Sequence, residues 1–167
     1  MRNRFSHLKP LVKYTGALFC FFGVVILVPM AVDLVCGGPD RWAFIVPSIA
    51  FLAAGIPMLR RGGKFAILDR RQAMLFCAVA WIGVSLIAAI PFRWALGGRY
   101  LDAVFETVSG FTTTGITMYS TPGATVVGGA GTLDDIRAAG MWGILFWRAL
   151  VQWLGGLGII SFFMLIM

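Results

Sequence analysis

Residues 99–118 read RYLDAVFETVSGFTTTGITM, and this stretch decides the fold because it sets a short amphipathic segment and a Thr-Thr-Thr-Gly turn between long apolar runs. Hydrocarbon offers backbone carbonyls no water, so a Thr/Gly turn at membrane depth must be buried in protein or line an aqueous cavity. Carbonyls that face such a cavity can replace the hydration shell of an ion. The pattern predicts a pore helix followed by a carbonyl-lined filter.

The composition places the whole chain in a membrane. Of its 167 residues 59% are hydrophobic and 13% are charged, whereas soluble domains are about a quarter charged. Crossing a hydrocarbon core of about 30 Å takes about 20 apolar residues. Four runs are long enough: Leu11–Val35, Trp42–Leu59, Ala73–Trp94 and Met141–Met167. We therefore expect an all-α integral membrane protein, in which a transmembrane helix hairpin precedes one helix–pore loop–helix repeat of a potassium-channel-like pore.

These runs divide the chain into two expected units, a two-helix hairpin at residues 1–68 and the pore repeat at residues 69–167. The apolar core of the first run is too long for a cleaved signal peptide. The last run reaches Met167 with no flanking Lys, Arg or polar cap, whereas natural membrane helices normally end in interfacial anchors. We therefore expect an N-terminal fragment of a longer transporter, truncated at its C-terminus.

The basic residues are sorted by loop, which predicts orientation. Net charge is +7, and the turn after the first run carries only Arg41 against Asp33 and Asp40. By the positive-inside rule the N-terminus and the 60–71 loop are cytoplasmic, while the Cys36–Asp40 turn and the Thr121–Asp135 loop are outside. We expect a multi-pass membrane protein with this orientation. The inward-facing cations are Arg2, Arg4, Lys9, Lys13, Arg60, Arg61, Lys64, Arg70 and Arg71.

Other functional classes find little support in the sequence. The basic residues are not interleaved with aromatics along one face as nucleic-acid binding needs, so no nucleic-acid partner is expected. Cys20, Cys36 and Cys77 lack metal or redox spacing and read as small apolar fillers, and His7 has no second ligand nearby. With no nucleophile–base or metal constellation, we expect neither an enzyme nor an organic cofactor, and potassium as the only metal.

The pore helix is predicted over Asp102–Ser109, with Asp102 as its N-cap and Gly110 at its left-handed exit. A helix of about ten residues is roughly 15 Å long, enough to reach half way through the membrane. The partial negative charge at its C-terminus favours a cation beyond it.

The filter itself is predicted at Thr112, Thr113, Thr114 and Gly115. The threonines supply successive carbonyls, and Gly115 can take the φ > 0 conformation that turns a carbonyl into the pore. A Thr/Gly cluster alone is typical of an ordinary loop. The half-length helix before it and the full-length spans on both sides favour a filter.

Three charged residues are expected at membrane depth, where ionisable groups are costly and usually paired. Asp102 and Glu106 could coordinate the ion directly, but bracing the filter or raising the local cation concentration is the favoured role. Arg148 would repel potassium if it faced the pore, so we expect it to pair with Glu106 or Asp102. Gly155, Gly156 and Gly158 permit close helix packing, which is their favoured role, and a kink or hinge is the alternative.

Three segments resemble the Trk/Ktr/HKT superfamily of potassium transporters: IPF at Ile90–Phe92, YLDAVFETVSGFTTTG at Tyr100–Gly115, and FWRALVQWLGGLGII at Phe146–Ile160. The resemblance implies four repeats around one pore, with Thr112–Gly115 as one potassium-binding filter strand. It also implies channel-like or symport potassium uptake by the full-length protein in the bacterial inner membrane. A homodimer and a cytosolic nucleotide-binding regulatory subunit are implied as well. The alternative is an accessory or structural membrane subunit without transport activity of its own.

Overall fold

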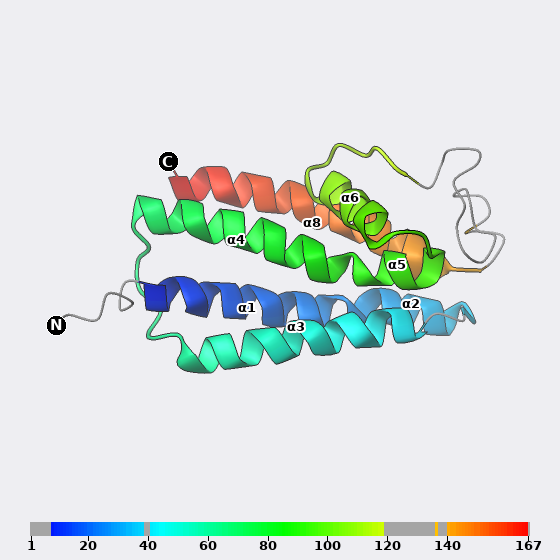
Figure 1. The fold of residues 1–167 in the computed structure, drawn as a ribbon, viewed down its shortest axis with the longest axis horizontal. Coiled ribbons are helices and arrows are strands. Elements are labelled where there is room, and N and C mark those ends of the chain that lie inside the picture. Colours follow the sequence, from blue (N-terminus) through cyan, green and yellow to red (C-terminus); the bar gives the residue numbers. More distant parts are fainter. Residues whose placement is uncertain (1–7, 39–40, 119–135, 137–139, 167) are drawn as a thin grey trace.

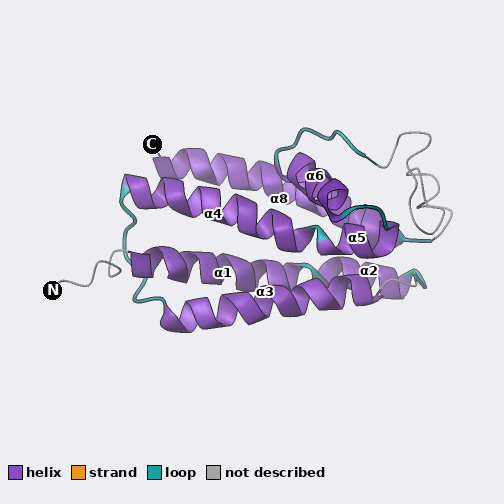
Figure 2. Cartoon of the chain, viewed as in Figure 1, coloured by secondary structure: helices purple, strands orange, loops and turns teal. Residues whose placement is uncertain are grey.

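The computed structural model describes residues 8–38, 41–118, 136 and 140–166, and within this part of the chain every regular element is a helix (Figure 2). The predicted all-α fold is therefore confirmed. The predicted outer loop Thr121–Asp135 lies outside the described residues. The helices are α1 (Lys9–Val25), α2 (Leu27–Val35), α3 (Arg41–Arg61), α4 (Arg70–Ala88), α5 (Ile90–Leu96), α6 (Tyr100–Phe111) and α8 (Trp142–Ile166).

Four helical segments are long and apolar enough to cross a membrane, and they run side by side along the molecule (Figure 1). They match the four predicted runs, with ends that differ by a few residues. The spans are Lys9–Val35, Arg41–Arg61, Arg70–Ala95 and Trp142–Ser161.

Two of the spans are interrupted once each. The first breaks at Ile26, between α1 and α2, and the third breaks at Ala89, between α4 and α5. Pro29 and Pro91 lie just after these breaks, and a proline removes a backbone donor and crowds the carbonyl four residues earlier. The interruption is slight, because the Ile26 N–H still donates to Phe22 O at 3.0 Å. Each span therefore continues in nearly the same direction.

The hairpin is held by close packing of α1 against α3. A Cβ added to Gly16 would lie 2.7 Å from Leu59 N, and one added to Gly55 would lie 2.8 Å from Cys20 Sγ. Small residues at both positions let the backbones approach, as is common between membrane helices. The Ser48 hydroxyl then donates to Gly23 O across the interface at 2.7 Å. Cys20 fills space in this interface, which fits the predicted role.

Asp33 joins the hairpin to the last helix. It was expected in the turn after the first span, but it lies within α2 and is fully buried. Its Oδ1 accepts the Gly143 N–H of α8 at 3.4 Å. The first turn of a helix has free N–H groups and a partial positive charge, so a carboxylate there is favourable. A Cβ on Gly143 would lie 2.8 Å from Asp33 Cβ, so this contact needs glycine.

The middle of α8 is fixed by Trp147, whose side chain is fully buried. Its indole Nε1–H donates to Ala88 O at the end of α4, at 3.2 Å. A buried tryptophan is tolerated when its indole N–H has a hydrogen-bond acceptor of this kind. Together Asp33 and Trp147 set the position of α8 relative to the hairpin and to α4.

Candidate functional site

The half-length helix α6 lies at the end of the bundle that also holds α2 and α5 (Figure 1). Its 12 residues correspond to roughly 18 Å at 1.5 Å per residue, so it is longer than predicted by two residues at each end. The assignment of Asp102 as N-cap is wrong. Arg99 precedes the helix with extended backbone (φ −86°, ψ 146°), which makes Asp102 the third helical residue.

Asp102 nevertheless helps to begin the helix. Its carboxylate accepts the Arg99 backbone N–H at 3.4 Å and the Arg99 Nε–H at 3.4 Å. An acidic side chain in the first turn satisfies a free donor and favours the positive end of the helix dipole. Asp102 therefore acts at the start of α6, away from the Thr/Gly segment at its other end.

The exit from α6 also differs from the prediction, because Gly110 stays helical. The helix ends at Phe111, and beyond it the Thr113 N–H donates to Gly110 O at 2.9 Å and the Thr114 N–H donates to Ser109 O at 3.0 Å. This is the Schellman arrangement of a helix C-terminus, which usually places glycine at the left-handed position. Here Thr113 occupies that position, with φ 57°.

A β-branched residue at positive φ is a backbone outlier that costs roughly 1–2 kcal/mol. Thr113 is the only non-glycine residue with positive φ in the described part of the chain. Backbone strain of this kind persists only where the surroundings hold it, and it gathers at functional sites. The strain marks the Thr/Gly segment as a candidate site.

Ser109 clamps the residues that follow. Its carbonyl accepts the Gly115 N–H at 3.4 Å, and its hydroxyl donates to Ile116 O at 2.6 Å. Gly115 itself has φ 75°, so the predicted left-handed conformation is confirmed. The segment thus turns at Thr113 and Gly115 and runs back along α6.

Glu106 holds the far end of this returning segment. Its side chain is 1% exposed, and its Oε2 accepts the Met118 N–H at 3.1 Å. Its Oε1 accepts the Arg148 Nε–H at 2.6 Å, while Arg148 is 25% exposed. Glu106 is one of the two partners that were predicted for Arg148. Glu106 therefore joins α6, α8 and the segment after the filter.

Glycines bring α8 against the end of α6. A Cβ on Gly155 would lie 2.2 Å from Phe111 O, and one on Gly110 would lie 2.9 Å from Val151 Cγ1. Gly110 is therefore needed for packing rather than for the helix exit. Of the glycines in α8, Gly155 makes the predicted close approach, whereas a Cβ on Gly158 would have ordinary contacts.

The predicted filter residues Thr112–Gly115 lie on the exposed surface of the chain. The Thr112 and Thr114 hydroxyls are 2.8 Å apart. Behind Gly115 is a cavity of about 10 Å³, which borders Glu106 and Arg148 and has room for about one water molecule. In the described residues no three His, Cys, Asp or Glu side chains gather as a metal site would require. The exposed polar side chains of the segment are the hydroxyls of Thr112, Thr113 and Thr114.

Sequence reasoning missed two contributors, Ser109 and Asp33. Ser109 gives no signal, because a serine near a helix end is common. Asp33 could have been found, since an acidic residue inside an apolar run is costly in a membrane and implies a partner. The structure brings Glu106, Gly110 and Arg148 together with Thr112–Gly115, and it leaves Asp102 at the opposite end of α6.

Comparison with known proteins gives a concordant set of relatives. The chain is 30% identical over 154 residues to the uncharacterised cation transporter MJ1485 of Methanocaldococcus jannaschii, covering 92% of this chain and 29% of that protein. It is 31% identical over 160 residues to the Trk system potassium uptake protein TrkH of Escherichia coli K12, with the same two coverages. It is 29% identical over 155 residues to TrkI of Halomonas elongata, covering 90% and 28%.

No protein-family model matches the chain. The chain spans less than a third of the length of the curated relatives it matches.

Proposed function

Because the chain is a partial-length member of the family of the Trk system potassium uptake proteins, we propose that it takes part in potassium uptake across the cytoplasmic membrane as one of four strands of a filter. The family consists of transporters and not of enzymes. The carrying observation is the turn at Thr113 and Gly115, both at positive φ, which lies exposed at the end of a half-length helix.

In this proposal Thr112, Thr113, Thr114 and Gly115 bind potassium. Glu106 acts as a brace and not as an ion ligand, because Arg148 and the Met118 N–H already occupy its two oxygens. Arg148 neutralises that brace, Gly110 lets α6 pack against α8, and Asp102 stabilises the start of the pore helix. The charge behind the filter is then balanced, and the ion is held by uncharged oxygens.

The proposed division of the chain follows the same logic. Residues 1–68 form a hairpin that supports the repeat at residues 69–167, and the contact of Asp33 with Gly143 supports this relation. The remaining repeats, a homodimer and a cytosolic nucleotide-binding regulatory subunit belong to the proposed full-length protein. An accessory subunit without transport activity is the competing function.

A chimera tests the proposed function. In E. coli TrkH, the segment that aligns with this chain is replaced by the chain, and the chimera is expressed in cells that lack potassium uptake systems. Growth at low external potassium should be restored, because the chain provides a working filter strand. Replacing Thr112–Gly115 with alanines in the same chimera should abolish that growth. A chimera that inserts normally but restores no growth would favour the accessory role.

We further propose that the N-terminus and the 60–71 loop face the cytoplasm, on the strength of the charge asymmetry. Cys36 is exposed at one end of the molecule and Lys64 lies in the loop at the other. With Cys20 and Cys77 replaced by serine, a membrane-impermeant thiol reagent should label Cys36 in intact cells. Lys64→Cys, on a background without Cys36, should be labelled only after the cells are opened. The reverse pattern would show the opposite orientation.

A further inference from the structure

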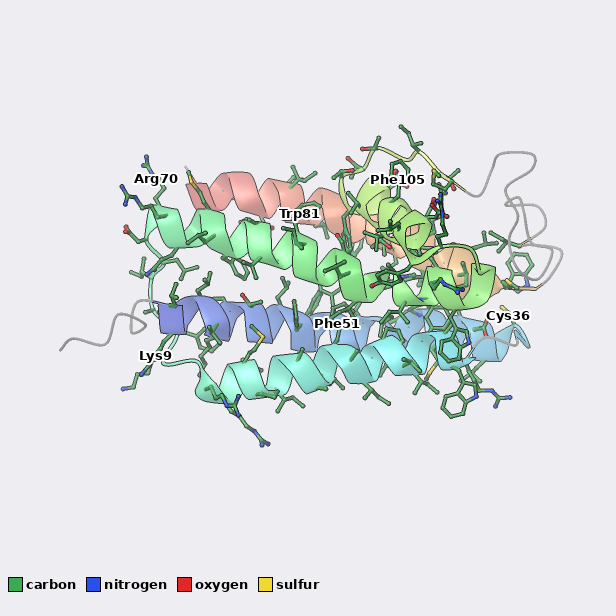
Figure 3. All side chains as sticks on the ribbon, viewed as in Figure 1. Lys9, Cys36, Phe51, Arg70, Trp81 and Phe105 are labelled. Atoms are coloured by element: carbon green, nitrogen blue, oxygen red, sulfur yellow. The ribbon has the colours of Figure 1, made fainter. Side chains whose placement is uncertain are left out.

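A basic surface forms where three helix ends meet. The start of α1, the end of α3 and the start of α4 lie at the same end of the bundle (Figure 1), and Figure 3 shows Lys9 and Arg70 at this end and Cys36 at the other. The 62–69 loop is tied to α1, since the Tyr14 hydroxyl donates to Ala66 O at 3.1 Å. A Cβ on Gly62 would lie 2.6 Å from Lys13 Cβ, so the loop and α1 are in close contact.

This contact gathers cations that are far apart in the sequence. Asp69 is the only acidic residue of the 60–71 segment. Within the residues that the structure describes, the two ion pairs involve Arg99 with Asp102 and Arg148 with Glu106, so neither neutralises this surface. We name it the basic cluster. It consists of Lys9, Lys13, Arg60, Arg61, Lys64, Arg70 and Arg71.

Large apolar side chains stand beside the basic cluster. Ile67 is 99% exposed and Phe65 is 57% exposed, although the loop that carries them is held in place. The Phe65 ring packs against Tyr14, with ring centroids 5.2 Å apart, and Lys13 Nζ lies 4.9 Å from the Phe65 centroid. Cations next to exposed apolar side chains are typical of protein segments at the boundary between headgroups and acyl chains.

We propose that the basic cluster binds the phosphate groups of anionic phospholipids, with Ile67 and Phe65 reaching the adjacent acyl chains. Membrane spans end at Arg61 and begin at Arg70, so the cluster lies at the level where headgroups are found. Each basic residue at the end of a membrane helix raises the affinity for anionic lipid roughly fivefold. A free phosphate ion would leave Ile67 in water, whereas the acyl chain of a bound lipid covers it.

Energy transfer in lipid nanodiscs tests this proposal. A donor dye is placed at Ala66→Cys in a protein whose three native cysteines are replaced by serine, or at native Cys36 with Cys20 and Cys77 replaced. The acceptor is an acyl-labelled phosphatidylglycerol or phosphatidylcholine at equal mole fraction. Transfer from position 66 should be greater with the anionic lipid, and transfer from Cys36 should be equal for the two lipids. Equal transfer from position 66 would overturn the proposal.

Substitutions that remove positive charge from the basic cluster provide a second test. Lys9→Gln, Lys13→Gln and Lys64→Gln combined should lower the apparent affinity for phosphatidylglycerol by about 100-fold, since three cations each contribute about fivefold. Arg41→Gln with Arg93→Gln, two exposed cations of other segments, should change it less than twofold. An excess of anionic lipid at position 66 that survives the triple substitution would overturn the proposal.

Two further measurements use the unaltered cluster, so they do not depend on whether the triple variant folds. Raising the salt from low to high concentration should remove most of the lipid excess, because exposed charges are screened. Inorganic phosphate at constant ionic strength should leave the excess in place. Displacement of the lipid by phosphate, or by a soluble cytosolic protein, would show that the cluster serves that ligand and would overturn the lipid assignment.

Discussion

Gly115→Ser in the full-length protein should narrow the preference for potassium over sodium by about tenfold. At φ 75° an L-residue costs roughly 1–2 kcal/mol, and about 1.4 kcal/mol corresponds to a factor of ten. Crowding is not the cause, because a Cβ at this position would lie 3.8 Å from Gln152 Nε2, at ordinary contact distance. A strand that relaxes to relieve the strain turns its carbonyl away from the ion. Uptake with potassium and sodium in competition measures the change.

Gly37 provides a matched control for this substitution. It has φ 72° and no atom within 4 Å of an added Cβ, so Gly37→Ser imposes a similar backbone strain in open space outside the filter. Its effect on folded yield should be similar, while selectivity should stay at the level of the unaltered protein. Unchanged selectivity in a normally expressed Gly115→Ser protein would remove Gly115 from the filter.

Arg148→Ala should lower folded stability by about 3–5 kcal/mol, the usual cost of removing one partner of a buried ion pair. The reason is that Glu106, with a side chain that is 1% exposed, would stay buried without the guanidinium that pairs with it. The midpoint temperature of thermal unfolding in detergent should fall, and the rate of potassium uptake should fall with it. The Met118 N–H contact of Glu106 links this loss to the segment after the filter, so selectivity should decline with stability.

A second substitution separates pairing from simple damage. Glu106→Gln in the Arg148→Ala background removes the stranded charge and should recover part of the stability, whereas strictly additive losses would argue against the pair. Arg99→Ala is the matched control, because the Arg99–Asp102 pair lies on the same helix with Arg99 83% exposed. Such surface pairs are worth about 0–1 kcal/mol, so the control should remain close to the unaltered protein.

The sequence was sufficient for features that depend on composition and on a single residue's chemistry. Span length follows from the thickness of hydrocarbon, and the positive φ of Gly115 follows from the absence of a Cβ. A partner for Arg148 was predictable because a membrane leaves few ways to accommodate a charge. These three conclusions need no knowledge of what packs against what.

The exit of α6 could not be predicted for the opposite reason. Glycine is the residue type that most often takes the left-handed position at a helix end. Val151, however, packs against Gly110 in the space that a Cβ would occupy, so Gly110 serves helix packing instead. The left-handed position then falls on Thr113, which has no intrinsic preference for it. Tertiary contacts decided between the two residues, and local sequence carries no record of those contacts.

The contact between Asp33 and Gly143 also constrains how the protein is made. The carboxylate is synthesised 110 residues before the amide that it binds, which at usual elongation rates is on the order of ten seconds earlier. The hairpin therefore enters the bilayer first and waits for α8, and the depth at which α8 comes to rest is set by an acceptor that is already in place. During biogenesis α8 is thus positioned against a hairpin that was inserted before it. A delay or error in inserting the hairpin would therefore misplace Arg148, even when the sequence of the repeat is unchanged.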